Sequence, residues 1–479
     1  MCTNLVELAV LSIWMLATFS TSLYSLNFYL LLWLNQKRNL NPFPSLNRGL
    51  PTVSIHIPVY NEVGVIEETL KACLNLDYPK DLLEIILVDD STDETTSIIR
   101  RYAERYPSLI KFIHRENRYG YKAGALQTAL EVSKGEFIAV LDAGSIPSRD
   151  FLKKAVKHFF MDEKIAFVQG RLKYKNDSKS WITKAVSIIY EFYRVFTQSS
   201  LYKGGLFVAS VGNGVLYRRL ALEDVGGWNW DTLAEDLDIS YRLQMKGWMG
   251  VFAEDAVCKD DVPESLNVFR IQYNRHIKGP IQNFKKHLPP LLSNHRIGVF
   301  KKLEAILQLS APLTFLIGQV SILAGVLFYL VAPPEDVTSL WQSPAGMTIS
   351  ALFTLSLVAP LVVYLYVLKI DSLKKLSYLA AVGLILTDYL LMGSKSILEL
   401  LLKKRHKWER TPKSGLDIDE AKSSSGGFSE KGFSDSIIRV FSSSVMFALT
   451  VVIAGKGLLP YSLGFLMPPV CWLISAAIE

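Results

Sequence analysis

The segment Ile86-Leu87-Val88-Asp89-Asp90-Ser91-Thr92-Asp93 is an apolar run that ends in two adjacent carboxylates. An apolar run bounded by polar turn residues predicts a buried β-strand, here over Glu84 to Asp89. Asp93 is expected to cap the following helix, which leaves Asp90 available for another role. Further strands are predicted at Val53 to Pro58 and Phe137 to Asp142, and helices at Val65 to Leu74, Glu94 to Tyr106 and Tyr121 to Val132. This alternation predicts an α/β domain with a mostly parallel sheet, in which ligands bind at the carboxyl ends of the strands.

The chain is longer than one ordinary soluble domain, with 479 residues of which 50% are hydrophobic. Uncharged runs at Leu8 to Leu34, Leu307 to Val331 and Met347 to Leu368 are long enough to cross about 30 Å of hydrocarbon as helices. Basic residues beside these runs explain the formal charge of +7 better than nucleic-acid binding does. The four scattered cysteines form no zinc or disulfide pattern, which fits a reducing cytoplasmic setting.

These patterns divide the chain into consecutive predicted segments. They are an N-terminal transmembrane anchor over residues 1–35, a cytoplasmic α/β domain over 50–295, two transmembrane helices over 305–370, an interfacial amphipathic helix over 373–402, a cytoplasmic loop over 403–435 and two closing transmembrane helices over 436–479. The interfacial helix is inferred because Asp388, Lys395 and Glu399 fall on one helical face. A crossing there would also place Lys403 to Arg405 outside, against the positive-inside tendency. We expect a multi-pass membrane protein whose catalytic domain is cytoplasmic.

Polar motifs follow several of the predicted strands. His56 to Glu62 and Asp142 to Pro147 each end a strand in a polar turn, and either one alone is equally typical of an ordinary strand-to-loop junction. His114 to Leu126 places cations and glycines before a predicted helix. Backbone N–H groups at a helix start, with Lys122 beside them, can hold a diphosphate.

Two further motifs lie downstream. Glu235, Asp236 and Asp238 place three acids within four positions, and the repulsion between them has a cost unless they cap a helix, bind a cation or do acid–base work. A solvated helix start is the plainer interpretation. Gln272 and Arg275 lie on a predicted helix and are expected to return toward the same sheet edge, although a helical surface would tolerate them equally well.

In this order and spacing, the motifs resemble those of membrane-bound family-2 glycosyltransferases, especially the cellulose synthase-like and mannan synthase-like members. The resemblance rests on R-x-G-Y-K-A-G-A-L at Arg118 to Leu126, E-D-x-D at Glu235 to Asp238 and W-x-R-T-P-K at Trp408 to Lys413. It spans nearly the whole chain. It implies a GT-A, Rossmann-like domain with a mostly parallel sheet, joined to an α-helical transmembrane region.

The resemblance also implies a role for each matching residue. Asp236, next to Glu235, would be the catalytic base that deprotonates an acceptor hydroxyl in a single inverting displacement. The implied donor-binding residues are Asp90, Lys122, Asp142, Gln272 and Arg275. His276 would contact the acceptor, and Thr411 and Lys413 would belong to a loop that closes over the donor.

The sequence departs from the family's motifs at three positions. Gly144 stands where the second acid of D-x-D is usual, which removes an oxygen ligand from a Mg²⁺ or Mn²⁺ site at Asp142. Ala234 replaces the threonine of T-E-D, a milder change. His276 replaces the tryptophan of Q-x-x-R-W, so the acceptor is expected to differ from that of a cellulose or mannan synthase.

The sequence therefore favours transfer of a hexose from a nucleotide-diphosphate sugar to a growing polysaccharide at the membrane. UDP-glucose is the preferred donor and GDP-mannose the next. Transfer of one sugar to an isoprenoid phosphate or glycolipid stays open, and so does a non-catalytic scaffold that binds nucleotide sugar. The expected partners are the donor, a glycan or lipid-linked acceptor and the lipid bilayer, with a homodimer possible and no nucleic acid.

Overall fold

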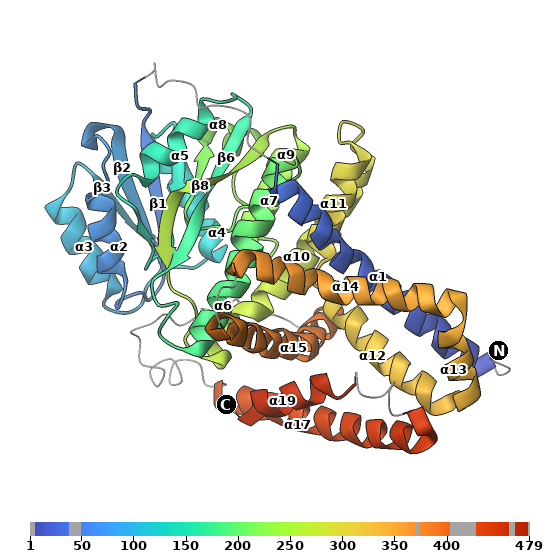
Figure 1. The fold of residues 1–479 in the computed structure, drawn as a ribbon. Coiled ribbons are helices and arrows are strands. Elements are labelled where there is room, and N and C mark those ends of the chain that lie inside the picture. The colour runs from blue at the N-terminus through green and yellow to red at the C-terminus, as the bar shows by residue number, and fades with distance from the viewer. Residues whose placement is uncertain (1–4, 38–48, 370–372, 403–427, 459–464, 478–479) are drawn as a thin grey trace.

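The structure is a computed structural model, and it describes residues 5–37, 49–369, 373–402, 428–458 and 465–477. An α/β domain occupies one side of the molecule, and long helices lie beside and below it (Figure 1). The helix α1 (Leu5–Asn35) precedes the domain in the chain but packs among the long helices that follow it. Thr18 on α1, for example, is hydrogen-bonded to Ser321 on α12 (Leu313–Val331) with 2.6 Å between their hydroxyl oxygens.

The domain is built on an eight-stranded mixed sheet with the order β3-β2-β1-β4-β7-β6-β8-β5. The strands are β1 (Val53–Val59), β2 (Leu83–Asp89), β3 (Ile110–His114), β4 (Phe137–Val140), β5 (Ile146–Pro147), β6 (Ile165–Tyr174), β7 (Val215–Arg218) and β8 (Met249–Asp260). Strands β3, β2, β1 and β4 are parallel, so their carboxyl ends share one edge. This arrangement confirms the predicted α/β fold and places the polar motifs side by side.

Helices cover the sheet as the hydrophobic pattern predicts. Next to the parallel strands lie η1 (Lys80–Leu82), α2 (Ile66–Leu74), α3 (Thr95–Arg105) and α4 (Tyr121–Val132). The rest of the domain contains α5 (Phe151–Phe159), α6 (Trp181–Tyr190), the π-helix η2 (Glu191–Phe196), α7 (Thr197–Lys203), α8 (Arg219–Asp224) and α9 (Glu235–Met245). The main core combines fully buried aliphatic side chains of β1 and β2, including Ile55, Ile57 and Ile85, with apolar side chains of α2, α5, β4, β6 and β8.

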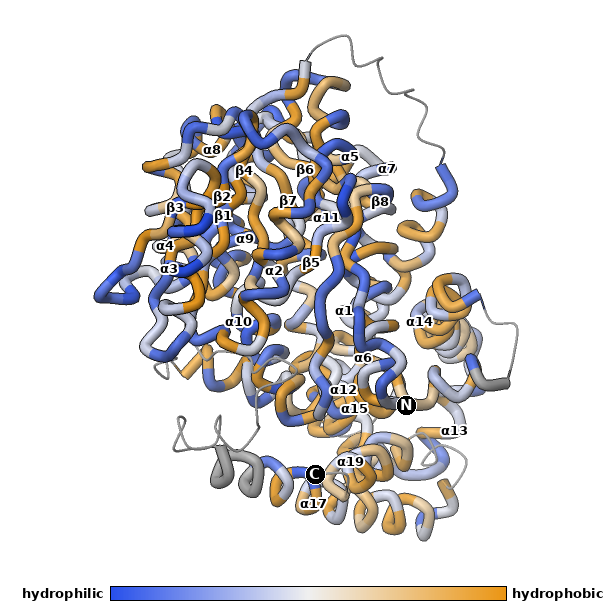
Figure 2. The backbone as a smooth tube through the Cα atoms, turned by 90° about the vertical axis from the view of Figure 1, so that its left-hand side faces the viewer, coloured by the Kyte–Doolittle hydropathy of each residue, from blue (hydrophilic) through white to orange (hydrophobic). Residues whose placement is uncertain are grey.

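The remaining helices connect the domain to the apolar part of the chain. They are α10 (Leu266–Ser293), α11 (Val299–Ser310), α13 (Pro334–Gln342), α14 (Pro344–Leu368), α15 (Leu373–Leu401), α17 (Phe428–Ile453), η3 (Ala454–Leu458) and α19 (Met467–Ala477). In Figure 2, α12, α15, α17 and α19 lie together on the side of the molecule away from the sheet.

By length and composition, five helices among the described residues could cross a membrane: Leu5–Asn35, Leu313–Val331, Pro344–Leu368, Lys375–Leu401 and Asp435–Leu458. The fourth falls on the segment predicted over 373–402 as an interfacial helix, and its length and composition would also allow it to cross. Its Asp388 is only 4% exposed and pairs with Arg270 and Arg439, so this polar residue faces protein partners. Of the two predicted closing spans, the second contains an 11-residue helix, Met467–Ala477, and its positions 459–464 and 478–479 lie outside the described residues.

Candidate active site

The parallel strand ends open onto a large cavity of about 1190 Å³. All the described residues that the sequence analysis assigned to catalysis, donor or acceptor line it: Asp90, Lys122, Asp142, Glu235, Asp236, Gln272, Arg275 and His276. They come from loops after β2 and β4 and from α4, α9 and α10. Thr411 and Lys413 lie outside the described residues. The fold thus brings together motifs that are separated by up to about two hundred positions in the sequence.

Asp90 follows β2 and is held in place by a bidentate ion pair. The Nε and Nη2 atoms of Arg115 donate to its two carboxylate oxygens at 2.7 and 2.6 Å. The preceding acid, Asp89, is fully buried and accepts a hydrogen bond from the hydroxyl of Thr96, so its role is structural. Asp93 accepts from the backbone N–H of Thr95 at 2.9 Å, but the N-cap position of α3 is Glu94, so the predicted cap lies one residue before it.

Lys122 lies in the first turn of α4, where the loop must pass close to the helix. Gly120 adopts φ +70°, and a Cβ added at Gly124 would lie 2.0 Å from the carbonyl oxygen of Tyr119, so both positions require glycine. The tight turn points the amine into the cavity, where it lies 2.7 Å from Oδ1 of Asp142. It also donates to the carbonyl of Gly212 at 2.9 Å.

The charge around Lys122 is set by two acidic motifs. Its Nζ lies 3.6 Å from Oε1 of Glu235 as well as near Asp142. Burial lowers the pKa of the Lys122 amine, but the two carboxylates raise it by more, so the net shift is upward. The amine is therefore a permanent cation at neutral pH, next to helix N–H groups that favour an anion.

Asp236 lies in the first turn of α9, beside Glu235 and close to Gly212. Burial and the neighbouring charge of Glu235 raise the pKa of the Asp236 carboxyl to about 7, against the opposing effect of Lys122. A carboxylate whose pKa lies near the ambient pH can take up a proton from a hydroxyl group and release it again. A Cβ at Gly212 would lie 2.9 Å from Oδ2 of Asp236, so a small residue is required opposite this acid.

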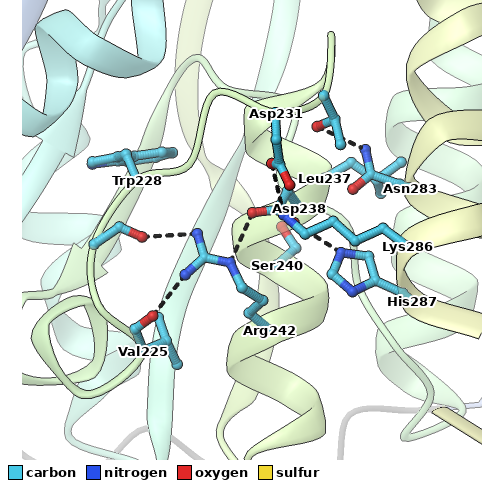
Figure 3. Close-up of polar contacts among 12 residues, drawn as sticks. Val225, Trp228, Asp231, Leu237, Asp238, Ser240, Arg242, Asn283, Lys286 and His287 are labelled. Atoms are coloured by element: carbon cyan, nitrogen blue, oxygen red, sulfur yellow. Dashed lines mark hydrogen bonds and ion pairs between the residues drawn. The ribbon is translucent and has the colours of Figure 1, made fainter. Parts of the chain in front are cut away.

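The third acid of the motif, Asp238, is a structural anchor. Figure 3 shows its fully buried carboxylate between Arg242, Lys286 and His287, whose nearest nitrogens lie 2.7, 2.7 and 2.9 Å from it. Burial alone would raise the pKa of Asp238, but the hydrogen bond from His287 and the two cations lower it to about 2. The cluster joins α9 to α10, so Asp238 holds the start of α9, with Glu235 and Asp236, in place.

On α10, Gln272 and His276 both approach Tyr190. The Tyr190 hydroxyl donates to Oε1 of Gln272, and the guanidinium of Arg194 lies 4.0 Å from the centroid of the Tyr190 ring. The His276 ring meets the same tyrosine edge-on with 6.3 Å between centroids. Burial and the charges of Arg194 and Arg275 lower the pKa of His276 well below its usual value, so its ring is neutral.

Sequence reasoning missed several cavity-lining residues. Asn213 accepts from the backbone N–H of Asp142 at 3.2 Å and donates to Asp260 at 2.9 Å, which fixes the turn after β4. Its setting in Gly212-Asn213-Gly214 is a turn signal that could have drawn attention to it. Tyr190 gave no such signal, because its neighbours form an ordinary apolar helix.

A divalent cation held at Asp142 by the protein alone would need further ligands from nearby side chains. Among the described residues, no group of three or more His, Cys, Asp or Glu side chains could hold a metal ion. Gly144 supplies no carboxylate and adopts φ +90°, a conformation that aspartate adopts only with strain. Asp142 alone could share Mg²⁺ or Mn²⁺ with substrate phosphates, which is how such cations are often held. Asp142 therefore fits as one ligand of a cation that the donor phosphates also hold.

Comparisons with known proteins show which family the α/β domain resembles. Residues 51–279 match the family model described as Glycosyltransferase like family 2. The chain is 32% identical over 267 residues to probable glucomannan 4-beta-mannosyltransferase 11 of Arabidopsis thaliana, and 31% identical over 265 residues to glucomannan 4-beta-mannosyltransferase 1 of Oryza sativa subsp. japonica. Both alignments cover 54% of this chain, and they cover 60% and 51% of the two relatives. The chain thus spans between half and two thirds of their lengths.

One solved structure is similar over most of its own length. It is the mannosyltransferase from Pyrobaculum calidifontis in complex with GDP-Man and Mn²⁺, with a TM-score of 0.54 and 25% sequence identity. The match covers 74% of this chain and 98% of that chain.

Proposed function

Because residues 51–279 form a family-2 glycosyltransferase domain with the GT-A fold, we propose that this chain is an inverting hexosyltransferase that works at the membrane. One observation carries the proposal. The acid pair Glu235 and Asp236, the cation Lys122 and the α10 residues Gln272 and Arg275 line a single cavity. Such a site can bind a nucleoside-diphosphate sugar and activate a hydroxyl group beside it.

Asp236 is the proposed base. An acceptor hydroxyl is a poor nucleophile at neutral pH, and its attack on the anomeric carbon becomes easier as the carboxylate takes its proton. The pKa of about 7 makes Asp236 a stronger base than an exposed aspartate and still leaves a large ionised fraction near neutral pH. In one displacement, the bond from the acceptor oxygen to the anomeric carbon forms while the bond to the diphosphate oxygen breaks. The configuration at that carbon is inverted.

Lys122 and Arg275 are proposed to stabilise the departing diphosphate. Both line the cavity, and Lys122 lies at the start of α4, whose N–H groups favour an anion. A divalent cation bound with the donor, for which Asp142 is the proposed protein ligand, would offset the same negative charge. Asp90 is proposed to contact the nucleoside part, because it lines the cavity at the end of β2.

GDP-mannose is the proposed donor, in place of the UDP-glucose favoured by sequence reasoning. The support comes from the relatives, which are described as glucomannan 4-beta-mannosyltransferases, and from the similar solved structure, which contains GDP-Man. Glucose and mannose have the same size, so the choice between the two sugars depends on hydrogen bonds in the pocket, whereas the guanine of GDP is larger than the uracil of UDP.

A polysaccharide is the proposed acceptor. The cavity continues between the long helices, where Tyr24, Asn27 and Glu304 line it and where Asn27 donates to Glu304 at 3.0 Å. Polar side chains are costly in an apolar helix bundle, and they suit a hydroxyl-rich glycan better than an isoprenoid or acyl chain. We propose that the α/β domain faces the cytoplasm and that the glycan leaves through the helices.

The test is nucleotide release by purified protein in lipid bilayers, offered GDP-mannose, UDP-glucose and other nucleotide sugars with manno- or gluco-oligosaccharide acceptors. We expect GDP release when GDP-mannose is offered, together with an oligosaccharide product that is longer than the acceptor. Sugar appearing on an isoprenoid phosphate or glycolipid would instead support the lipid-acceptor alternative. Nucleotide binding without turnover of any donor would contradict catalysis and favour a scaffold.

A further inference from the structure

Helix α10 contacts both the long helices and the segment that carries the proposed catalytic acids. Figure 1 shows it between the α/β domain and α15. Its first half packs along α15, and its second half holds residues 231–238. The same helix carries Gln272 and Arg275 on the cavity side. A movement of α10 would therefore move both groups of site residues.

Two ion pairs and an aromatic stack join α10 to α15. Arg270 donates to Oδ2 of Asp388 at 3.0 Å, and Lys278 donates to Oε2 of Glu399 at 2.8 Å. Between them, the rings of Tyr273 and Tyr389 stack with planes 11° apart. Lys278 is only 1% exposed, so its charge depends on its protein partners.

Asp388 also connects α10 to the closing helices. Its Oδ1 accepts from Arg439 on α17 at 2.7 Å and from Ser475 on α19 at 3.1 Å. A carboxylate buried among apolar helices is tolerated when its oxygens are paired in this way. Its geometry fixes α10, α15, α17 and α19 relative to one another.

The second half of α10 holds the turn from which α9 begins. Gln282 accepts from the backbone N–H of Leu233 at 2.8 Å, and Asn283 donates to the carbonyl of Ala234 at 3.1 Å. A Cβ at Gly279 would lie 2.7 Å from the Cβ of Ala234, so the helix and the turn are in close contact. Glu235 and Asp236 follow this turn directly, and Asp238 is held from the same helix.

We propose that Asp388 and Glu399 are positioning residues for sugar transfer, a role that rests on the proposed function. Through Arg270 and Lys278 they fix α10 against α15, and α10 in turn fixes the turn before Asp236. Neither carboxylate is among the residues that line the cavity. A displacement of about 1 Å at a reacting group can cost up to about 100-fold in rate, so loosening this helix is expected to lower kcat.

Glu399→Gln tests the proposal, with Asp435→Asn as the matched control. Asp435 forms its ion pair with Lys395 and so joins α15 to α17, and it acts on α10 through the weaker effect of its charge on Arg270. We expect Glu399→Gln to lower kcat by about 10-fold or more and to weaken nucleotide binding by a smaller factor, because Asp90, Lys122 and Asp142 reach the cavity from the sheet side and, of the proposed donor-binding residues, only Gln272 and Arg275 reach it from α10. Asp435→Asn should change kcat by less than about twofold.

The double variant K278E/E399K, which exchanges the charges of the pair, should recover most of the lost kcat. Should Glu399→Gln fail to fold, Glu399→Asp keeps the charge but shortens the reach by one methylene, and it should lower kcat by several fold. Equal losses of kcat in Glu399→Gln and Asp435→Asn, or no loss in either, would overturn the positioning role. Absence of turnover by the unmodified protein would instead refute the proposed function.

Discussion

The Nζ atom of Lys122 lies 2.7 Å from Oδ1 of Asp142, and this contact joins the N-terminus of α4 to the carboxylate that follows β4. Two motifs twenty residues apart in sequence thereby become one anion-binding surface with a carboxylate at its edge. Without a bound diphosphate, the ammonium is neutralised by the acids around it. A donor would compete for that cation, and this competition determines what a substitution of Lys122 does.

Replacing Lys122 with methionine should weaken nucleotide binding. The variant loses a charge-assisted contact and leaves Asp142 and Glu235 without the cation. The Kd for GDP or UDP is therefore expected to increase by about 10- to 100-fold. Isothermal titration calorimetry of the variant and the unmodified protein measures this Kd. Lys154→Met, at an exposed pair with Asp150, is the control and should bind nucleotide normally.

Asp236→Asn should abolish turnover while nucleotide binding persists. Asparagine keeps the shape of the side chain but cannot accept a proton, and loss of a general base costs about 10²- to 10⁴-fold. Initial rates of nucleotide release and calorimetric Kd values should be measured on the same preparation. Turnover at more than a tenth of the unmodified rate would show that another group is the base.

The pH dependence of kcat/KM should have an acidic limb near pH 7. The active form of Asp236 is ionised, so activity should rise as pH increases through its raised pKa of about 7. Glu235→Gln removes the negative neighbour that helps to raise this pKa, and the limb should move to lower pH. A limb that stays in place, or moves to higher pH, would contradict the proposed coupling of the two acids.

Asp238→Asn should destabilise the protein. The substitution removes a fully buried carboxylate and leaves Arg242, Lys286 and His287 around an uncharged amide, which costs about 3–5 kcal/mol in the free energy of unfolding. Thermal unfolding should show a lower Tm. Asp231→Asn, at a carboxylate that is 58% exposed and also pairs with Lys286, should cost less than about 1 kcal/mol. Similar losses in both variants would contradict the anchor role.

Mn²⁺ should not bind tightly to the nucleotide-free protein. The described residues contain no group of three His, Cys, Asp or Glu side chains that could bind a metal ion, and Asp142 is paired with Lys122. Electron paramagnetic resonance of added Mn²⁺ should therefore show free ion without nucleotide. Stoichiometric binding before nucleotide is added would reveal a resident metal site.

Much of the domain could be predicted from sequence because its signals are local. The apolar runs that end at Val59, Asp89 and Val140 form the parallel strands of the sheet, and Tyr121–Val132 is a helix with the predicted bounds. Hydrophobic periodicity and turn residues are properties of neighbouring positions, so one chain is enough to read them. The site residues followed from the rule that strand ends converge, together with the family resemblance.

The environment of the polar face of α15 could not be predicted from the sequence. Asp388, Lys395 and Glu399 fall on one face, and the pattern is the same whether that face meets water, lipid headgroups or other helices. Only the packed structure supplies Arg270 and Arg439 as partners of Asp388. The interfacial location was inferred from the polar face and from the basic residues Lys403 to Arg405, and the partners of that face lie far away in the sequence.

The sequence by itself determined the alternation of strands and helices, the apolar helices and the identity of the acids and cations at the strand ends. The tertiary structure decided which of them meet. It assigned Asp238 to an anchor and Asp236 to the cavity, added Asn213 and Tyr190 to the site, and placed α10 between α15 and the proposed catalytic turn. The reason is physical: propensity and periodicity act between near neighbours, whereas the burial and pairing that set the role of a charge depend on residues brought together only by folding.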